Sequence, residues 1–238
     1  MSKLENKNIV IIGATSGIGL GAAIEARREG ANVWGAGRSQ ENIDKAKLLA
    51  PDVTFVQLDT HDADGLMRLF ESIGQIDHLV GCATGANRTM APFLEQTDEQ
   101  FREAFNKFWG YCNVIRQGAP FLAPAGSITL VSGIPARKCN PGMSSISCVG
   151  NAVEALTRAL ALELAPRRVN VVAPGIIDTE MFDRLGDNKA AALEQMGKNV
   201  PLGRVGQANE VAGAIVHAMT NTYMTGATLD VDGGSLLP

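Results

Sequence analysis

The sequence is poor in aromatic residues and in cysteine. Phe, Trp and Tyr make up only 5% of its 238 residues, and two of them are tyrosines. The four cysteines form no CxxC pair and show no spacing typical of metal ligands, so we expect reduced thiols and no metal site. A chain of this length can bury an apolar core without disulfides or metals.

Long apolar runs and an excess of basic charge are also missing. No run of 18 apolar residues occurs, and the opening Met1–Asn6 has no signal-peptide core, so no membrane span or secretion is predicted. The net charge is −4 and no basic stripe appears, which argues against a nucleic-acid partner. We therefore expect a cytoplasmic protein that acts on a small molecule.

Short apolar runs alternate with amphipathic segments of helix length along the whole chain. The expected strands are Asn8–Ile12, Asn32–Ala36, Thr54–Leu58, Ile76–Cys82, Ser127–Val131, Arg168–Ala173 and Thr228–Val231. The expected helices are Gly17–Arg28, Glu41–Leu49, Asp64–Ser72, Thr97–Phe121, Ser147–Leu164 and Ala208–Met219. This alternation predicts an α/β fold with one doubly wound parallel seven-stranded sheet, a Rossmann fold, and helices on both faces. We expect residues 1–238 to form a single domain, in which the more polar residues 176–200 form a flap over a site or a surface excursion.

A glycine-rich turn joins the first strand to the first helix. It reads Gly13-Ala14-Thr15-Ser16-Gly17-Ile18-Gly19. Glycines at this spacing let backbone N–H groups approach a pyrophosphate, and the helix N-terminus adds unpaired donors and a favourable dipole. Residues Gly13, Thr15, Ser16, Gly17, Ile18 and Gly19 are thus predicted to bind the phosphates of a dinucleotide.

The end of the second strand indicates which dinucleotide is bound. An acid commonly follows this strand and binds the ribose diol, but here the chain reads Arg38-Ser39. An arginine pairs well with a 2′-phosphate, whereas a carboxylate would repel it. We therefore predict NADP(H) as the cofactor, bound in part by Arg38 and Ser39.

Several longer motifs resemble the short-chain dehydrogenase/reductase family over nearly the whole chain. They are the glycine turn, Leu58-Asp59, residues 155–164 (ALTRALALEL), residues 168–175 (RVNVVAPG), residues 201–204 (PLGR) and residues 225–234 (TGATLDVDGG). The resemblance implies that Asp59 contacts the adenine and that Ala83 packs beside its ribose. It implies that Pro174, Gly175, Ile177 and Thr179 lie along the nicotinamide. It also implies a homotetramer or homodimer, with helices 97–121 and 147–164 at the interface.

The chain departs from the family where the family carries out its chemistry. Counting from the matching motifs, the family's tyrosine and lysine fall on Ile146 and Gly150, and its serine falls on Gly133. The family's asparagine falls on Lys107. The tyrosine protonates the developing alkoxide, so an efficient reductase would need a substitute acid.

Two residues are candidates for the missing chemistry. Lys107 would deliver a proton or bind a carboxylate if it faces the cavity; otherwise it pairs with Glu103 on a solvated face. Ser132, at the end of the fifth strand, would bind substrate or satisfy local backbone. We therefore expect an NADP(H)-dependent oxidoreductase acting on a small carbonyl or alcohol with an atypical proton-delivery site. The alternatives are an inactive NADP(H)-binding sensor or partner subunit, and non-redox chemistry in the same cavity.

Overall fold

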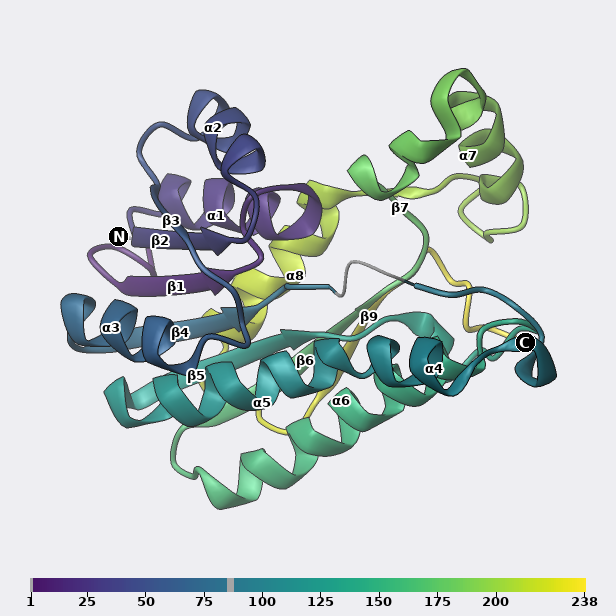
Figure 1. Ribbon diagram of the computed structural model, residues 1–238. Coiled ribbons are helices and arrows are strands. Elements are labelled where there is room, and N and C mark those ends of the chain that lie inside the picture. Colours follow the sequence, from purple (N-terminus) through teal and green to yellow (C-terminus); the bar gives the residue numbers. More distant parts are fainter. Residues whose placement is uncertain (1, 85–87) are drawn as a thin grey trace.

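The apolar runs rich in Val and Ile form the strands of a parallel sheet. The computed structural model describes residues 2–84 and 88–238. The strands are β1 (Asn8–Ile12), β2 (Asn32–Gly37), β3 (Thr54–Gln57), β4 (Ile76–Gly81), β5 (Leu122–Val131), β6 (Arg168–Pro174), β7 (Ile177–Asp178), β8 (Gly206–Gln207) and β9 (Thr228–Val231). Within the described residues, one seven-stranded sheet has the order β3-β2-β1-β4-β5-β6-β9, with every pairing parallel (Figure 1). The predicted fold class is confirmed.

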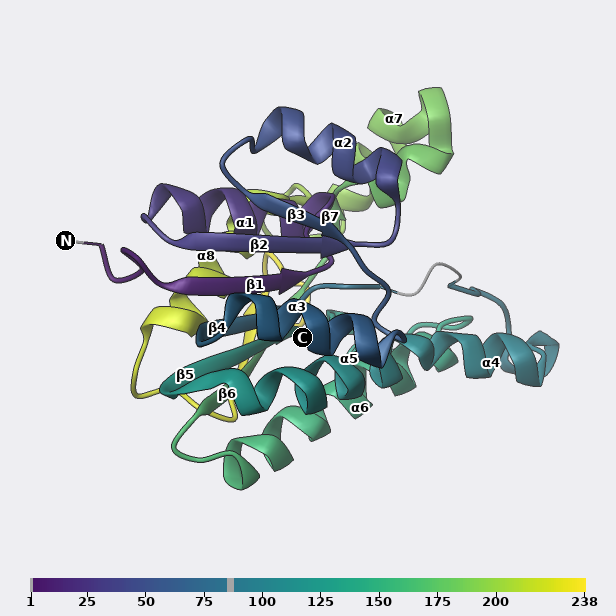
Figure 2. The same ribbon diagram turned by 60° about the vertical axis from the view of Figure 1, so that its left-hand side comes forward.

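The helices connect these strands and cover the sheet. They are α1 (Gly17–Arg28), α2 (Gln40–Leu49), α3 (Ala63–Ile73), α4 (Asp98–Ala104), α5 (Asn106–Gly118), α6 (Ser144–Glu163), α7 (Lys189–Gly197) and α8 (Ala208–Thr220). Four 3-10 segments lie in the described connections: η1 (Phe93–Glu95), η2 (Ala119–Phe121), η3 (Ile134–Ala136) and η4 (Glu180–Asn188). Figure 2 shows helices on both sides of the sheet.

Two apolar clusters bury the two faces of the sheet. Ile9 and Ile11 of β1 pack in one cluster with residues of α1 and α8, whereas Val10 and Ile12 pack in the other with residues of α3, α5 and α6. Successive side chains of a strand point to opposite faces, so a strand covered on both sides must be apolar at every position. The near-continuous apolar runs in the sequence follow from this packing.

The element boundaries differ from the predictions mainly in the long segment that was expected to be one helix. The backbone N–H of Phe105 donates to the carbonyl of Arg102 (3.0 Å), and this 3-10 bond separates α4 from α5. A capping box begins α4: Thr97 Oγ1 accepts from the N–H of Gln100, and Gln100 Oε1 accepts from the N–H of Thr97. Gly30 has a left-handed conformation after α1 (φ 84°), as glycines that follow a helix often do.

The segment predicted as a flap or surface excursion forms β7, η4 and α7. Figures 1 and 2 show α7 standing apart from the helices that cover the sheet. Strand β7 follows the end of β6 and pairs with β8, so the start of the segment is tied to residues 206–207, which follow its end. Over the residues that the structure describes, no helix has the length and apolarity needed to cross a membrane.

A buried histidine in β4 gives the fold a pH dependence. His78 is 7% exposed, and its Nδ1 lies 2.8 Å from Ser127 Oγ. Burial lowers the pKa of His78 from 6.5 to about 4, and the nearby Asp77 offsets only part of this shift. The unfolded chain therefore takes up a proton between pH 6.5 and 4 that the folded chain resists, and stability falls as the pH falls.

We expect His78 to reduce the free energy of unfolding by about 3 kcal/mol between pH 7 and 4. Urea unfolding at several pH values would measure this loss, and His78→Leu should remove that part of it. His61→Leu, at an exposed histidine, is the control and should keep the wild-type slope. Equal slopes in wild type and His78→Leu would contradict this assignment.

Candidate functional site

The predicted cofactor residues meet along the carboxyl edge of the sheet. A methyl group built on Gly13 would lie 2.4 Å from the backbone nitrogen of Ala83, so the glycine turn touches the end of β4. A methyl on Gly17 would lie 3.2 Å from Thr179 Cγ2, at the start of η4. Residues predicted from distant parts of the sequence thus lie side by side, as ligand-binding residues of open parallel sheets do.

The glycine turn itself is held by backbone contacts that exclude side chains. A Cβ on Gly19 would lie 1.9 Å from the carbonyl oxygen of Gly13, which is far inside van der Waals contact. Gly13 has φ 91° and Gly17 has φ 51°, and both lie in the region that favours glycine. The first turn of α1 contains no acidic residue, so its free N–H groups suit an anion. These features fit the phosphates of a dinucleotide.

The two hydroxyl-bearing residues of the turn, Thr15 and Ser16, lie in different surroundings. Ser16 is the N-cap of α1, and its side chain makes no capping hydrogen bond. Thr15 lies against β2, where a Cβ on Gly37 would be 2.6 Å from its Oγ1. Ile18 is partly buried and packs on the core.

The residues predicted for the adenosine end follow β2 and β3. Arg38 is exposed and its carbonyl accepts from Gln57 Nε2 (2.9 Å). Ser39 is the N-cap of α2, with its Oγ accepting from the N–H of Asn42 (3.2 Å), so it retains its hydroxyl proton for a ligand. Asp59 accepts the N–H of His61 through Oδ1 (2.9 Å).

The residues predicted for the nicotinamide end follow β6. Pro174 ends that strand, and the N–H of Gly175 donates to the carbonyl of Val231 (3.0 Å). Ile177 is buried in β7, and Thr179 is the N-cap of η4 with no capping bond from its side chain. These roles stay predictions, and the placement is compatible with them.

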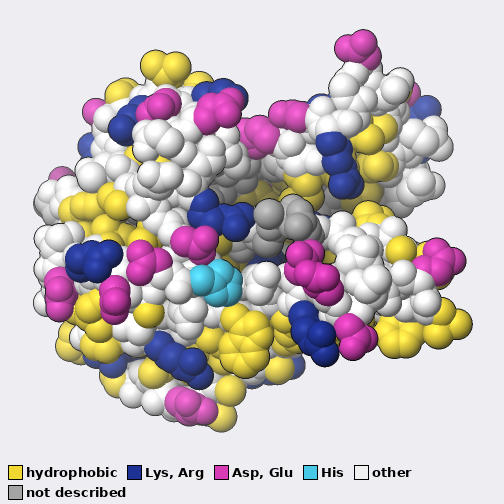
Figure 3. Space-filling view, viewed as in Figure 1, with side chains coloured by type: hydrophobic (Ala, Val, Ile, Leu, Met, Phe, Trp, Pro, Cys, Tyr) yellow, Lys and Arg dark blue, Asp and Glu magenta, His cyan; other side chains and the backbone are white. Residues whose placement is uncertain are grey.

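A pocket opens at the same edge, between β5, α5 and α6. It is lined by Thr84, Arg88, Ala104, Lys107, Ser132, Gly133, Pro135, Ile146, Val149 and Gly150, and encloses about 40 Å³. The positions where the resemblance expects tyrosine, lysine, serine and asparagine all contribute to this lining. Figure 3 shows the surface hollowed between the projection bearing α7 and the rest of the molecule, with both basic and acidic side chains at the edge of the hollow.

Lys107 points into this pocket from α5. Its Nζ lies 3.4 Å from the carbonyl oxygen of Ser132 and 5.6 Å from the centre of the Tyr111 ring. The alternative that Lys107 pairs with Glu103 on a solvated face is therefore wrong, because tertiary packing places the amine against the end of β5. Burial lowers the pKa of Lys107 from 10.5 to about 7, and the positive charge of Arg88 adds to the shift.

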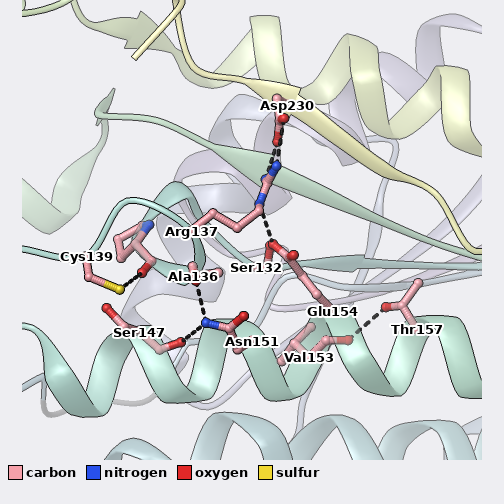
Figure 4. Close-up of polar contacts among 11 residues, drawn as sticks. Ser132, Ala136, Arg137, Cys139, Ser147, Asn151, Val153, Glu154, Thr157 and Asp230 are labelled. Carbon is pink, nitrogen blue, oxygen red and sulfur yellow. Dashed lines mark hydrogen bonds and ion pairs between the residues drawn. The ribbon is translucent and has the colours of Figure 1, made fainter. Parts of the chain in front are cut away.

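Ser132 is held by a chain of charged groups that the sequence did not reveal. Its Oγ donates to Oε1 of Glu154 (3.1 Å), a buried carboxylate on α6 (Figure 4). Arg137 Nε lies 3.4 Å from the same oxygen, and its guanidinium also binds Asp230 at the end of β9. The hydroxyl of Ser132 is thus oriented toward Glu154, and its carbonyl oxygen faces Lys107.

Gly150 stands at the position where the resemblance expects lysine, and the space beside it is filled by a neighbouring residue. A Cβ on Gly150 would lie 2.9 Å from the methyl group of Ala136 in η3. Asn151 donates through Nδ2 to the carbonyl of Ala136, which ties η3 to the start of α6 (Figure 4). At Gly133 a Cβ would meet only Pro135 Cδ at 3.3 Å, so a serine would fit there with a small adjustment.

Comparison with known proteins decides the family. A family described as enoyl-(acyl carrier protein) reductase matches residues 13–235. A short-chain dehydrogenase/reductase of Stachybotrys chlorohalonatus, ATR9, is 33% identical over all of both chains. The chain belongs to the short-chain dehydrogenase/reductase family. A 3-oxoacyl-[acyl-carrier-protein] reductase of Thermotoga maritima, FabG, is also 33% identical over 99% of this chain and 100% of that one.

Solved structures of this family superpose closely on the chain. The MalC reductase/Diels–Alderase from Malbranchea aurantiaca matches with a TM-score of 0.90 and 31% identity, over 100% of this chain and 99% of that one. A small-chain dehydrogenase in complex with NADPH matches with a TM-score of 0.84 and 33% identity, over 98% of this chain and all of the other. The chain therefore has the scaffold of an oxidoreductase family.

Proposed function

We propose that this protein is an NADP(H)-dependent oxidoreductase that reduces a small carbonyl compound, with Lys107 as the proton donor. The observation that carries the proposal is the Lys107 amine inside the pocket, 3.4 Å from the Ser132 carbonyl at the carboxyl edge of the sheet. In this proposal Ile146 and Gly150 stand at the family's tyrosine and lysine positions, and α5 supplies the acid instead.

The acid–base properties of Lys107 suit this role. When bound, the dinucleotide would supply hydride to the carbonyl carbon. With a pKa of about 7, Lys107 is partly protonated at neutral pH and can donate to an oxygen that gains negative charge. The Ser132 carbonyl orients the ammonium, and the Glu154 carboxylate holds Ser132 in place. Ser132 thus acts as a positioning residue.

The proposed cofactor is NADP(H), bound through the turn 13–19 and through Arg38. The exposed Arg38 follows β2, where a 2′-phosphate would lie, and a relative of 33% identity has been solved with NADPH. The carboxylate of Glu180 approaches Gly17, with Oε2 3.4 Å from a Cβ built there. A pyrophosphate in the turn would repel this exposed group, so binding favours a position of Glu180 nearer to solvent. Residues 176–200 are the proposed flap.

We expect Arg38→Asp to weaken NADPH binding by roughly 10–100-fold, because charge-assisted hydrogen bonds of about 1.5–3 kcal/mol are lost. NADH binding should change by less than threefold. Titration calorimetry with both cofactors would measure this, and Arg28→Asp, on the exposed last turn of α1, is the control. Unchanged NADPH affinity in Arg38→Asp would show that another residue binds the 2′-phosphate.

Oxidation of NADPH tests the proposed activity directly. The protein would be assayed against aldehydes, ketones, oxo acids and enones, with absorbance at 340 nm as the readout. Turnover well above the protein-free rate for at least one class supports an oxidoreductase. Background rates for every class, in protein that binds NADPH, would overturn it.

The second candidate is a non-catalytic NADP(H)-binding protein that senses the cofactor or serves as a partner subunit. The contact between Gly150 and Ala136 favours it, because η3 fills the space that a lysine side chain at residue 150 would need. NADPH binding that alters the affinity for a partner, without turnover, would support this reading.

A homodimer or homotetramer through α5 and α6 belongs to both proposals, and the exposed Trp109 and Leu162 on these helices suit it.

A further inference from the structure

The pocket beside Lys107 contains a second cation. Arg88 lines it together with Lys107, and none of the ten lining residues in the described part of the chain is an aspartate or glutamate. The Arg88 guanidinium contacts the thioether of Met181 in η4 (Nη1 to Sδ 3.3 Å), which is only a weak acceptor. The pocket therefore carries positive charge that its own lining does not balance.

The described groups around the pocket do not neutralise this positive charge. Burial lowers the pKa of Arg88 from 12.5, and Arg184 in η4 adds to the effect. Cys82 and Tyr111 also face Lys107, but burial raises the pKa of both, so neither supplies a negative charge near pH 7. The nearest carboxylate behind Ser132, that of Glu154, is paired with Arg137. Arg88 and the partly buried Lys107 line one small pocket and repel each other, and an anionic ligand would relieve this repulsion.

The size of the pocket limits what the anion can be. About 40 Å³ has room for roughly three water molecules at 10–15 Å³ each, which suits a carboxylate and the carbon next to it. A guanidinium binds a carboxylate through two parallel N–H donors, so Arg88 supplies direction as well as charge.

We propose that Arg88 binds a carboxylate of the substrate, so that the compound reduced in this pocket is a small oxo acid whose carbonyl lies beside Lys107. This inference rests on the proposed reductase function. Hydride adds to the carbonyl carbon, the C=O π electron pair moves to the oxygen, and the Lys107 ammonium gives that oxygen a proton. The oxo acid is reduced to a hydroxy acid, and NADPH is oxidised to NADP⁺.

Binding of an unreactive acid separates this site from catalysis. Oxamate has a carboxylate beside an amide carbonyl, and ethyl oxamate is its neutral counterpart. We expect calorimetry on the NADPH-loaded protein to show oxamate binding at least tenfold tighter than ethyl oxamate. Arg88→Met should remove that difference, Arg88→Lys should restore part of it, and Arg102→Met, at an exposed arginine of α4, should keep it. Equal binding of both probes to folded wild type would overturn the carboxylate site.

Kinetics then distinguish failure of the site from failure of the proposed function. For a paired 2-oxo acid and its ester, wild type should show a ratio of kcat/KM of at least ten, and Arg88→Met should bring the ratio close to one, mainly through KM. Selective oxamate binding without turnover of any carbonyl would refute the reductase and keep the anion site. Turnover with no preference for the acid, and no selective oxamate binding, would refute the site and keep the reductase. If Arg88→Met does not fold, Arg88→Gln serves in its place.

Discussion

Replacing Lys107 with methionine should reduce kcat/KM for carbonyl reduction by about 10²–10³-fold, within the range that general acid catalysis contributes. Methionine keeps the length of the side chain and removes the only nitrogen cation that α5 directs at Ser132 within the described structure. The variant should fold at least as well as wild type, because burying an ammonium costs free energy that methionine does not. NADPH affinity should change little, since the turn 13–19 and Arg38 lie elsewhere along the edge of the sheet.

The pH profile shows whether Lys107 acts as an acid. In wild type, kcat/KM should fall above about pH 7, because the ammonium loses its proton there and only the protonated form can donate. Lys107→Met should be slow at all pH values and lack this decline. Lys107→Arg keeps the positive charge at every accessible pH, but its guanidinium is too weak an acid to release a proton, so it should bind substrate and remain slow.

A matched lysine variant controls for charge alone. Lys47→Met removes an exposed lysine from the last turn of α2 and should keep both the rate and the pH profile. If Lys107→Met retains more than a third of the wild-type rate with the same profile, the proton comes from another group. The same profile also bears on the oxo acid proposal, because a bound carboxylate would raise the pKa of Lys107 in the complex. The decline of kcat should then lie at higher pH than that of kcat/KM.

The fold was predictable because its signals are local and agree with one another. The strand-forming runs are apolar at consecutive positions, as in β1, where Val10 and Ile11 pack in opposite clusters. Such a pattern is typical of a strand that is covered on both faces. The side-chain capping box at Thr97 marks the start of a helix, and the left-handed Gly30 marks the end of another. The break at Phe105 has no such mark, since the sequence around it continues the helical pattern, and the change to a 3-10 bond was missed.

The phosphate turn could be predicted for the same reason, whereas the pocket depends on tertiary packing. Lys107 follows Glu103 by four residues, a spacing that favours a surface ion pair, and only the position of β5 turns its amine inward. Arg88 follows β4 in a stretch without periodicity, so nothing local indicated that it would reach the pocket. Glu154 resembles an ordinary helical acid, although its place within an apolar run was a signal that it is buried.

Gly19→Ala should lower the free energy of unfolding by several kcal/mol, roughly 3–5 kcal/mol, and abolish stabilisation by NADPH. The added methyl group would lie 1.9 Å from the carbonyl oxygen of Gly13; the oxygen belongs to the backbone and the methyl carbon is bonded directly to it, so neither can rotate away. Helix α1 must therefore move outward. This movement separates its first N–H groups from the turn and opens the contact of Gly13 with Ala83. Thermal unfolding with and without NADPH would measure both effects.

Gly213→Ala provides the matched control, because it makes the same change within a helix where space is available. No atom lies within 4 Å of a Cβ built on Gly213 in α8, so alanine there should stabilise the fold by about 0.5–1 kcal/mol through its better helix propensity. NADPH should then raise the Tm of Gly213→Ala as much as that of wild type. Gly19→Ala should lower the free energy of unfolding and Gly213→Ala should raise it. This difference separates the effect of the steric clash at the turn from the effect of helix propensity. A Gly19→Ala protein with wild-type Tm and wild-type NADPH affinity would mean that α1 can move without cost, and that its distance from the turn does not determine cofactor binding.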